Sequence, residues 1–294
     1  MALDFRQTRI ELLLRSQNAD GGWGYFAGRQ SWLEPTCYSL LALHTLEEGK
    51  TATERGWKFL RARQRPSGGF SPNALVPDAC WATSLCVTLH AVRGEFDAGW
   101  KLGVEWLLAS EGAEGTWLER AINLVRPLPV EYDRRFKGWP WLPGTSSWVE
   151  PTAHAIVALK KVPPHSAISA RAQKRIEEAE RMLMDRRSTD GGWNYGNRRV
   201  LKTNLPSYPE TTGIALTGLQ GSKRWNLQSA VDAARKEWPQ TQSSLAKAWL
   251  AIALRNAGDT LPAPEPLAPG NDLMAAALEA MACPQGGHQW LTAG

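Results

Sequence analysis

The sequence has few cysteines and no long apolar run, and each shortage excludes a large class of protein. The four cysteines, Cys37, Cys80, Cys86 and Cys283, show no paired spacing. We therefore expect buried reduced thiols in a cytosolic protein rather than a disulfide framework. No apolar run is long enough to span a bilayer, and the first residues do not resemble a signal peptide. The 294 residues are enough to build a full core in one large domain.

Neither sign of charge dominates the chain. The 34 Lys and Arg residues and the 29 Asp and Glu residues leave a net charge of +5, and both signs alternate in stretches such as 175–181. Interspersed charges are typical of solvated helix faces, so we expect no nucleic-acid partner. The net charge is compatible with peripheral contact with an anionic membrane surface. The sequence does not specify a partner subunit.

Common catalytic motifs are also missing. The chain has no Ser-His-Asp spacing and no His-x-x-x-His pair, and its Gly-Gly pairs follow expected helices rather than strands, so they are not phosphate cradles. Of the five histidines, His44 and His90 lie late in expected helices, and His165 and His288 lie in loops. Only His154 lies near the start of a helix.

What the chain has in abundance is glycine and tryptophan, arranged in a repeat. A helical run, a Gly-Gly-aromatic block, a loop and an acidic residue opening an apolar helix recur at 17–23, 64–70, 138–141 and 190–193, with a last block at 285–288. We expect the first glycine to supply a positive φ where a helix ends, and the aromatic ring to pack on the neighbouring helix pair. Such blocks are a stability device, and repeated helix pairs must stack or close on themselves.

Two kinds of helix alternate along the chain. The first kind is amphipathic and charged, at 5–17, 51–64, 95–110, 166–187, 223–238 and 271–282. The second kind is apolar nearly all round, at 34–46, 78–92, 150–160, 210–220 and 243–256. Helices that are apolar on every side are buried on every side. The pattern predicts an all-α protein, an α/α toroid or barrel of about five to six hairpins with inner and outer helix rings. We expect one domain over 1–294, with an irregular insertion at about 117–149.

An acidic residue opens four of the expected inner helices: Glu34, Asp78, Glu150 and Glu210. Because the inner helices of a toroid run parallel, we expect these carboxylates to ring one mouth. One interpretation is capping, since carboxylates favour helix N-termini. The other is that one desolvated carboxyl group has a raised pKa and donates a proton. Asp78, whose sequence context differs from the rest, is the first candidate for this acid.

A metal site is the alternative use of the same region. Asp78 and Cys80 lie two residues apart at an expected helix start, and His154 lies one turn after Glu150. These three side chains could hold zinc with an open position. Equally, His154 could be a histidine of the core.

The blocks Gln-Asn-Ala-Asp-Gly-Gly-Trp-Gly at 17–24 and Ser-Thr-Asp-Gly-Gly-Trp-Asn at 188–194 resemble a known motif. They are similar to the Gln-Trp repeats of squalene-hopene cyclases, oxidosqualene cyclases and the β subunits of protein prenyltransferases. The resemblance implies an α/α barrel whose cavity holds an isoprenoid chain. In proton-initiated cyclases the acid lies in an Asp-x-Asp-Asp motif, of which the stretch at 76–79 keeps only Asp78.

The resemblance leaves three functions open. The first is a terpene-cyclase/mutase-like protein, an isomerase or lyase without a cofactor, with Asp78 as its acid. Its isoprenoid ligand would lie against Trp81, Trp139, Trp141, Trp148, Glu34, Glu150 and Glu210. The second is a zinc-dependent prenyltransferase, because its β subunits carry zinc on an Asp-x-Cys that Asp78 and Cys80 resemble. Those enzymes have a distant histidine as a further zinc ligand, which the matching stretch at 208–212 lacks. They also need a helical partner subunit. The third is a non-catalytic binding or scaffold barrel.

Overall fold

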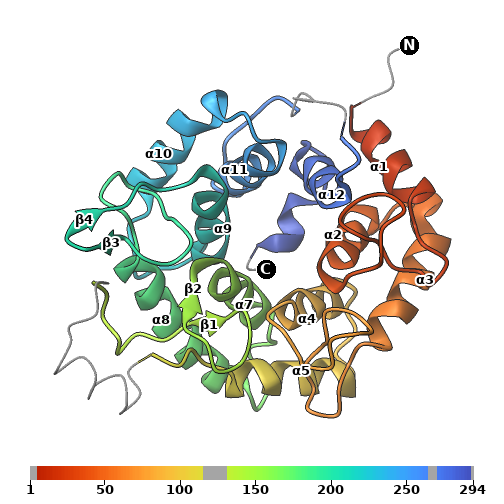
Figure 1. The fold of residues 1–294 in the computed structure, drawn as a ribbon, viewed down its shortest axis with the longest axis horizontal. Coiled ribbons are helices and arrows are strands. Elements are labelled where there is room, and N and C mark those ends of the chain that lie inside the picture. Colours follow the sequence, from red (N-terminus) through yellow and green to blue (C-terminus); the bar gives the residue numbers. More distant parts are fainter. Residues whose placement is uncertain (1–4, 115–130, 264–269, 293–294) are drawn as a thin grey trace.

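The helices form a closed double ring (Figure 1). A computed structural model describes residues 5–114, 131–263 and 270–292. The outer helices described are α1 (Phe5–Arg15), α3 (Lys50–Arg61), α5 (Ala98–Ala109), α8 (Ser169–Asp185) and α10 (Gln228–Glu237). The inner helices are α2 (Leu33–Leu43), α4 (Thr83–Val92), α7 (Val149–Lys160), α9 (Pro209–Leu219), α11 (Ser244–Asn256) and α12 (Leu273–Ala282). The predicted α/α toroid is therefore confirmed.

The ring closes because each inner helix packs between two others. Contacts run from α2 through α4, α7, α9, α11 and α12 and back to α2. The prediction that 271–282 belongs to the outer kind is wrong: α12 is buried nearly all round and completes the inner ring. Its one charged residue, Glu279, is buried in an ion pair with Arg9 of α1, 2.8 Å away. No helix among the described residues is long and apolar enough to cross a membrane.

Short elements connect the helices. Two-residue strands form two antiparallel hairpins, β1 (Trp139–Pro140) with β2 (Ser147–Trp148), and β3 (Arg199–Val200) with β4 (Thr203–Asn204). Single turns of 3-10 helix lie at η1 (Glu47–Gly49), η2 (Trp238–Gln240) and η3 (His288–Leu291). The first hairpin belongs to the insertion expected at 117–149, of which residues 117–130 lie outside the described part.

Each Gly-Gly-aromatic block is a corner that ties an outer helix to the next inner one. The first glycine has a positive φ, +88° at Gly21 and +104° at Gly191, as predicted. The indole N–H of Trp23 donates to the carbonyl of Leu13 at 2.8 Å, which satisfies a free carbonyl near the end of α1. The same bond recurs from Trp193 to the end of α8, at 2.6 Å. The corners therefore cap helices, which confirms their structural role.

The second glycine of a block is required by close packing. A Cβ atom on Gly192 would lie 2.4 Å from Oγ1 of Thr212 and 2.7 Å from the side chain of Ser207. We expect Gly192→Ala to destabilise the protein by about 1–3 kcal/mol, because overpacking forces neighbouring groups to shift. The control is Gly28→Ala, where φ is +74° but no atom lies within 4 Å, so it should cost about 1 kcal/mol from backbone strain alone. Urea unfolding of both variants checks this, and equal losses would contradict it.

The loops that precede the inner helices are joined into one rim. The carbonyl two residues after each corner aromatic accepts a backbone hydrogen bond from the neighbouring repeat. The pairs are Leu273 to Tyr25 at 2.8 Å, Leu33 to Pro72 at 2.8 Å, Trp81 to Trp141 at 3.3 Å and Val149 to Tyr195 at 2.9 Å. These bonds bring the N-terminal ends of the inner helices to one mouth of the ring, as predicted.

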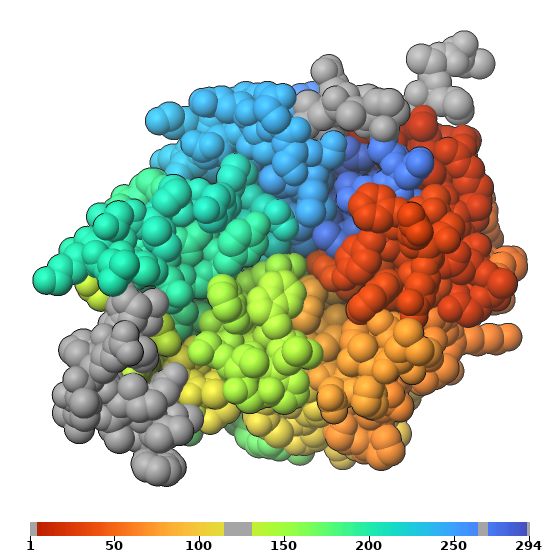
Figure 2. All heavy atoms as spheres, viewed as in Figure 1, coloured from red at the N-terminus to blue at the C-terminus, as the bar shows by residue number. Residues whose placement is uncertain are grey.

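Aromatic side chains fill the middle of the ring. Tyr38 of α2, His154 of α7 and Trp249 of α11 come from alternate inner helices and touch one another, with ring centroids 5.5 to 6.1 Å apart. All three are almost completely buried. In Figure 2 the atoms meet over the centre of the ring without an open channel. The expected isoprenoid cavity is thus filled by side chains at the level of these rings.

The C-terminal segment closes the other end of the ring. η3 lies inside the ring in Figure 1, near the C-terminal ends of the inner helices. The ring of Trp290 packs edge-on against His44 after α2, with centroids 5.0 Å apart. Nζ of Lys161, after α7, donates to the carbonyl of Thr292 at 2.7 Å. The C-terminal segment therefore covers the end of the ring opposite the rim.

Candidate functional site

A repeated hydrogen bond sets the register of the four corner repeats. The backbone N–H of each corner aromatic donates to a buried threonine in or near the first turn of the next inner helix, at 2.9–3.0 Å. The pairs are Trp23 with Thr36, Phe70 with Thr83, Trp139 with Thr152 and Trp193 with Thr212. The residues two positions before these threonines are Glu34, Trp81, Glu150 and Glu210. In the second repeat, the equivalent of the three glutamates is therefore Trp81 and not Asp78.

The structure corrects the predicted place of Asp78. Helix α4 begins at Thr83 rather than at 78, and Asp78 is an exposed loop residue. Asp78 lies five positions before Thr83. The residues five positions before the other three threonines are the loop serines Ser31, Ser147 and Ser207. The carboxylate of Asp78 lies in solvent, so it does not meet the condition of desolvation that made it the candidate acid.

The other three acidic residues gather at the mouth, in the first turns of α2, α7 and α9. The pKa of Glu34 is raised to about 7, chiefly by burial and then by the charges of Glu210 and Asp272, while the hydrogen bond from Tyr25 lowers it. Burial also raises the pKa of Glu150 well above its usual range, helped by the charges of Glu34 and Glu210. The pKa of Glu210 is raised by burial alone. The three carboxyl groups therefore share one low-polarity region, and the protonated form is favoured most strongly at Glu150.

The glutamates do not act as helix caps. The N-cap positions belong to Trp32, Trp148 and Tyr208, none of which makes a side-chain capping bond. Within the residues described, no Arg, Lys or His forms an ion pair with Glu34, Glu150 or Glu210. Such unpaired buried carboxyl groups reduce stability, and groups of this kind are concentrated at functional sites.

Tyr25 completes the cluster. Its hydroxyl group donates a 2.5 Å hydrogen bond to Oε2 of Glu34. Burial and the neighbouring Glu34 both raise the pKa of Tyr25, so it stays a donor. The ring of Tyr25 packs on Trp32, with centroids 5.9 Å apart. Tyr25 thus holds the Glu34 carboxyl group in place.

The aromatic side chains in the middle of the ring form the floor of this site. Glu34 lies four residues before Tyr38 on α2, and Glu150 lies four residues before His154 on α7. Residues at this spacing lie on one face of a helix, so each carboxyl group lies one turn above an aromatic ring. The Tyr38 hydroxyl group and Nε2 of His154 share a 3.1 Å hydrogen bond. Burial lowers the pKa of His154 to about 3, which keeps its ring neutral. An acidic upper layer therefore faces a buried aromatic floor.

The predicted tryptophans have separate places. Trp81 packs on the floor, with ring centroids 5.3 Å from His154 and 5.0 Å from Trp141, so both tryptophans border the site. Trp139 is instead a corner residue, whose indole N–H donates to the carbonyl of Leu107 of α5 at 2.9 Å. Its ring lies under the Arg175 guanidinium of α8, 4.2 Å away. We therefore withdraw Trp139 from the site.

Trp148 is the N-cap residue of α7, where it is half-buried. A Cβ atom on Gly196 would lie 2.9 Å from its indole ring, so Trp148 packs directly on the backbone of the following loop. Trp148 is also the last residue of the β1–β2 hairpin, where it pairs with Trp139.

The predicted zinc ligands do not come together. Nε2 of His154 is hydrogen-bonded to Tyr38, and Asp78, Cys80 and His154 do not bring their ligand atoms within 4.8 Å of one another. Asp78 points to solvent from its loop. Within the described ranges, the one place where three metal-ligating side chains lie within 4.8 Å of one another is elsewhere, at His90, Glu95 and Asp97.

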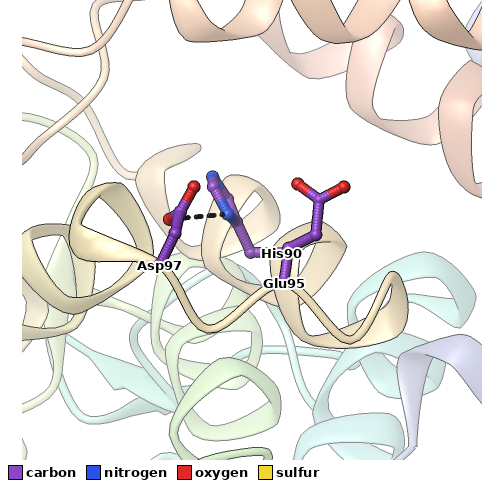
Figure 3. Close-up of side chains that lie close together, drawn as sticks. All are labelled: His90, Glu95 and Asp97. Carbon is purple, nitrogen blue, oxygen red and sulfur yellow. Dashed lines mark ion pairs between the residues drawn. The ribbon is translucent and has the colours of Figure 1, made fainter.

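That second group is an ion-pair network (Figure 3). Nδ1 of His90 lies 3.5 Å from Asp97, whose carboxylate also caps α5. Glu95 is paired with Arg61 at 3.0 Å and with Arg93 at 2.8 Å. Two guanidinium groups already balance the two carboxylates, so the charge that would attract a cation is neutralised.

Sequence reasoning missed Tyr25, Tyr38 and Trp249. A signal for the first was present: aromatic residues recur two positions after the corner aromatic, at Tyr25, Trp141 and Tyr195. Tyr38 and Trp249 lie 211 positions apart in the chain and meet only because the ring closes.

Comparisons with known proteins support the fold. No protein-family profile and no curated protein matches the sequence. Among solved structures, the type II terpene cyclase MstE from Scytonema is similar, with a TM-score of 0.55 and 18% identity over 86% of this chain and 71% of that one. A family 8 glycosyl hydrolase, an endoglucanase from Klebsiella pneumoniae, aligns with a TM-score of 0.60 and 13% identity over 92% of this chain and 96% of that one. The predicted resemblance to terpene cyclases is thus confirmed at the level of the fold.

Proposed function

We propose that the chain is a terpene-cyclase-like protein whose acid is Glu150 rather than Asp78. The observation that carries this proposal is the cluster of three carboxyl groups over an aromatic floor, without a cationic partner among the residues described. Glu150 is the most buried of the three, at 8% exposure, and the charges of both neighbours add to the burial that keeps it protonated. A carboxyl group held neutral near pH 7 has a proton to donate.

The ligand we propose is an isoprenoid chain. Crystal structures of MstE contain geranylgeranyl dihydroxybenzoate in one case and merosterolic acid A in another. Since the middle of the ring is filled, an apolar chain would lie above the floor, against Trp81 and Trp141. Their π faces stabilise positive charge, and a site that excludes water protects a carbocation.

Each carboxyl group then has a task in the proposed reaction. The Glu150 proton adds to an alkene carbon, and the π electrons form the new C–H bond and leave a cation on the chain. Glu210 is half-buried and lacks a hydrogen-bond partner in the structure as described, so it can accept the proton released when the cation collapses to an alkene. Glu34 and Tyr25 link the cluster to the rim, where exchange with solvent takes the proton from Glu210 and restores the one on Glu150. This sequence of steps is an isomerisation and needs neither zinc nor another cofactor.

The test is an incubation with a geranylgeranyl-bearing aromatic acid. We expect a product of unchanged mass and shorter chromatographic retention. Glu150→Gln should lower the rate at least 100-fold, in line with the usual contribution of general acid catalysis. The matched control, Asp78→Asn, should retain the rate. Loss of turnover in Asp78→Asn, with Glu150→Gln active, would contradict the proposal.

A second candidate is glycoside hydrolysis. The alignment with the family 8 endoglucanase covers almost all of that chain, and glycosidases use pairs of carboxyl groups whose pKa values differ. In this case Glu150 would be the acid and Glu210 the base. Release of reducing sugar from a soluble β-glucan, lost in both Glu150→Gln and Glu210→Gln, would favour this function over cyclisation.

A further inference from the structure

Exposed apolar side chains are concentrated on the rim. Eight large apolar residues are exposed among the residues described, and six of them lie on the four loops that precede α2, α4, α7 and α9. These six are Phe26, Leu75, Leu142, Tyr195, Leu201 and Tyr208. The other two, Phe96 and Leu102, lie beside and on α5. Since backbone hydrogen bonds join the four loops, the six side chains are held on one face around the mouth.

The tip of the β3–β4 hairpin is one of the two most exposed apolar points of this face, with Leu75. Leu201 is 75% exposed, and both Leu201 and Lys202 have left-handed backbones, with φ of +51° and +64°. Two-residue hairpins with this geometry favour Asn-Gly, because other side chains are strained there. A strained leucine that is three-quarters exposed gains little stability within the chain, which points to a use outside it.

The charge of the same four loops indicates which kind of surface they bind. Residues 16–32, 62–82, 138–148 and 186–208 contain eight basic and three acidic side chains. Two of the basic ones are paired with glutamates outside these loops, Arg186 with Glu114 and Arg199 with Glu131, which leaves six basic against three acidic side chains. Arg29, Arg198 and Lys202 are exposed. The face therefore carries a positive charge around separate apolar tips.

We propose that this face docks on an anionic lipid bilayer. Scattered tips on several loops match a flat, deformable surface better than a single groove on a protein partner. The stacked pair Tyr195 and Tyr208, with ring centroids 5.4 Å apart, has the amphipathic character of side chains at a membrane interface. Leu201 enters the acyl boundary and Lys202 contacts the headgroups, so the mouth opens toward the lipid. The proposal concerns the surface and does not depend on which carboxyl group is the acid.

The test is co-sedimentation with vesicles of phosphatidylcholine, with and without phosphatidylserine. We expect the wild type to bind the anionic vesicles and to lose most binding in high salt. The double variant Leu201→Asn with Lys202→Gly relieves the hairpin strain, so it should fold at least as well, yet bind about tenfold or more weakly. Leu102→Ser, an exposed leucine on α5, is the matched control and should bind like the wild type.

Three outcomes would overturn the proposal. The first is that the wild type does not bind anionic vesicles. The second is that the double variant binds as tightly as Leu102→Ser. The third is a dimer in sedimentation equilibrium that the double variant dissociates, since it would assign the face to a second copy of the chain.

Discussion

Glu34→Gln is expected to stabilise the protein at pH 8 and to leave its stability near pH 4 unchanged. The pKa of Glu34 is about 7 in the folded chain, against an ordinary value of 4.5. The folded state thus binds more protons than the unfolded state between these values, so stability falls as pH rises from about 4.5 to 7. This shift in pKa corresponds to about 3 kcal/mol of stability that the wild type loses by pH 8. The variant does not lose this stability, because glutamine is neutral at every pH.

The measurement is urea unfolding of wild type and variant at several values of pH. The matched control is Glu279→Gln, which also changes a buried glutamate of an inner helix. Because Glu279 is paired with buried Arg9, its removal leaves a cation without a partner and should cost about 3–5 kcal/mol. A loss of stability in Glu34→Gln at pH 8 would show that the carboxylate is held by contacts absent from the described structure.

Trp249→Ala is expected to give the largest loss of stability in the ring. Trp249 is 1% exposed and packs on Tyr38 and His154 across the middle of the ring. Truncation of such a residue costs about 3–5 kcal/mol, because the ring of helices cannot collapse into the space. Benzene should then raise the melting temperature of the variant and not of the wild type, since dry apolar cavities bind such ligands.

The control for this prediction is Trp238→Ala. Trp238 is half-buried in η2, and its ring contacts Lys247, 5.4 Å away. Its loss should cost about 1 kcal/mol, the size of an exposed cation–π contact. Equal losses for the two tryptophans, with no effect of benzene, would contradict the filled ring.

The double ring was predictable because it depends on local patterns. Apolar helices alternate with amphipathic ones, and Gly-Gly corners separate them. Helix α12 broke this rule, since its single charge is neutralised by Arg9, more than 250 residues away in the chain. A long-range ion pair has no local signal, so the composition of 271–282 was misleading.

The wrong placement of Asp78 at a helix start has a different origin. A spacing of thirteen residues separates Trp23 from Thr36, Phe70 from Thr83 and Trp139 from Thr152. This spacing was present in the sequence, and it places Trp81 in the position of the glutamates. The prediction chose Asp78 because it is acidic, although Asp78 lies three positions before Trp81. The filled centre could not be predicted, because it depends on the distances across the closed ring.

The most direct test of the central claim is whether Glu150 is protonated at neutral pH. Infrared spectroscopy detects the C=O stretch of a protonated carboxyl group apart from that of ionised carboxylates. At pH 7 we expect such a band in the wild type and in Asp78→Asn, and a clear loss of intensity in Glu150→Gln. A wild type without this band, or a Glu150→Gln spectrum identical to it, would contradict the assignment of Glu150 as the acid.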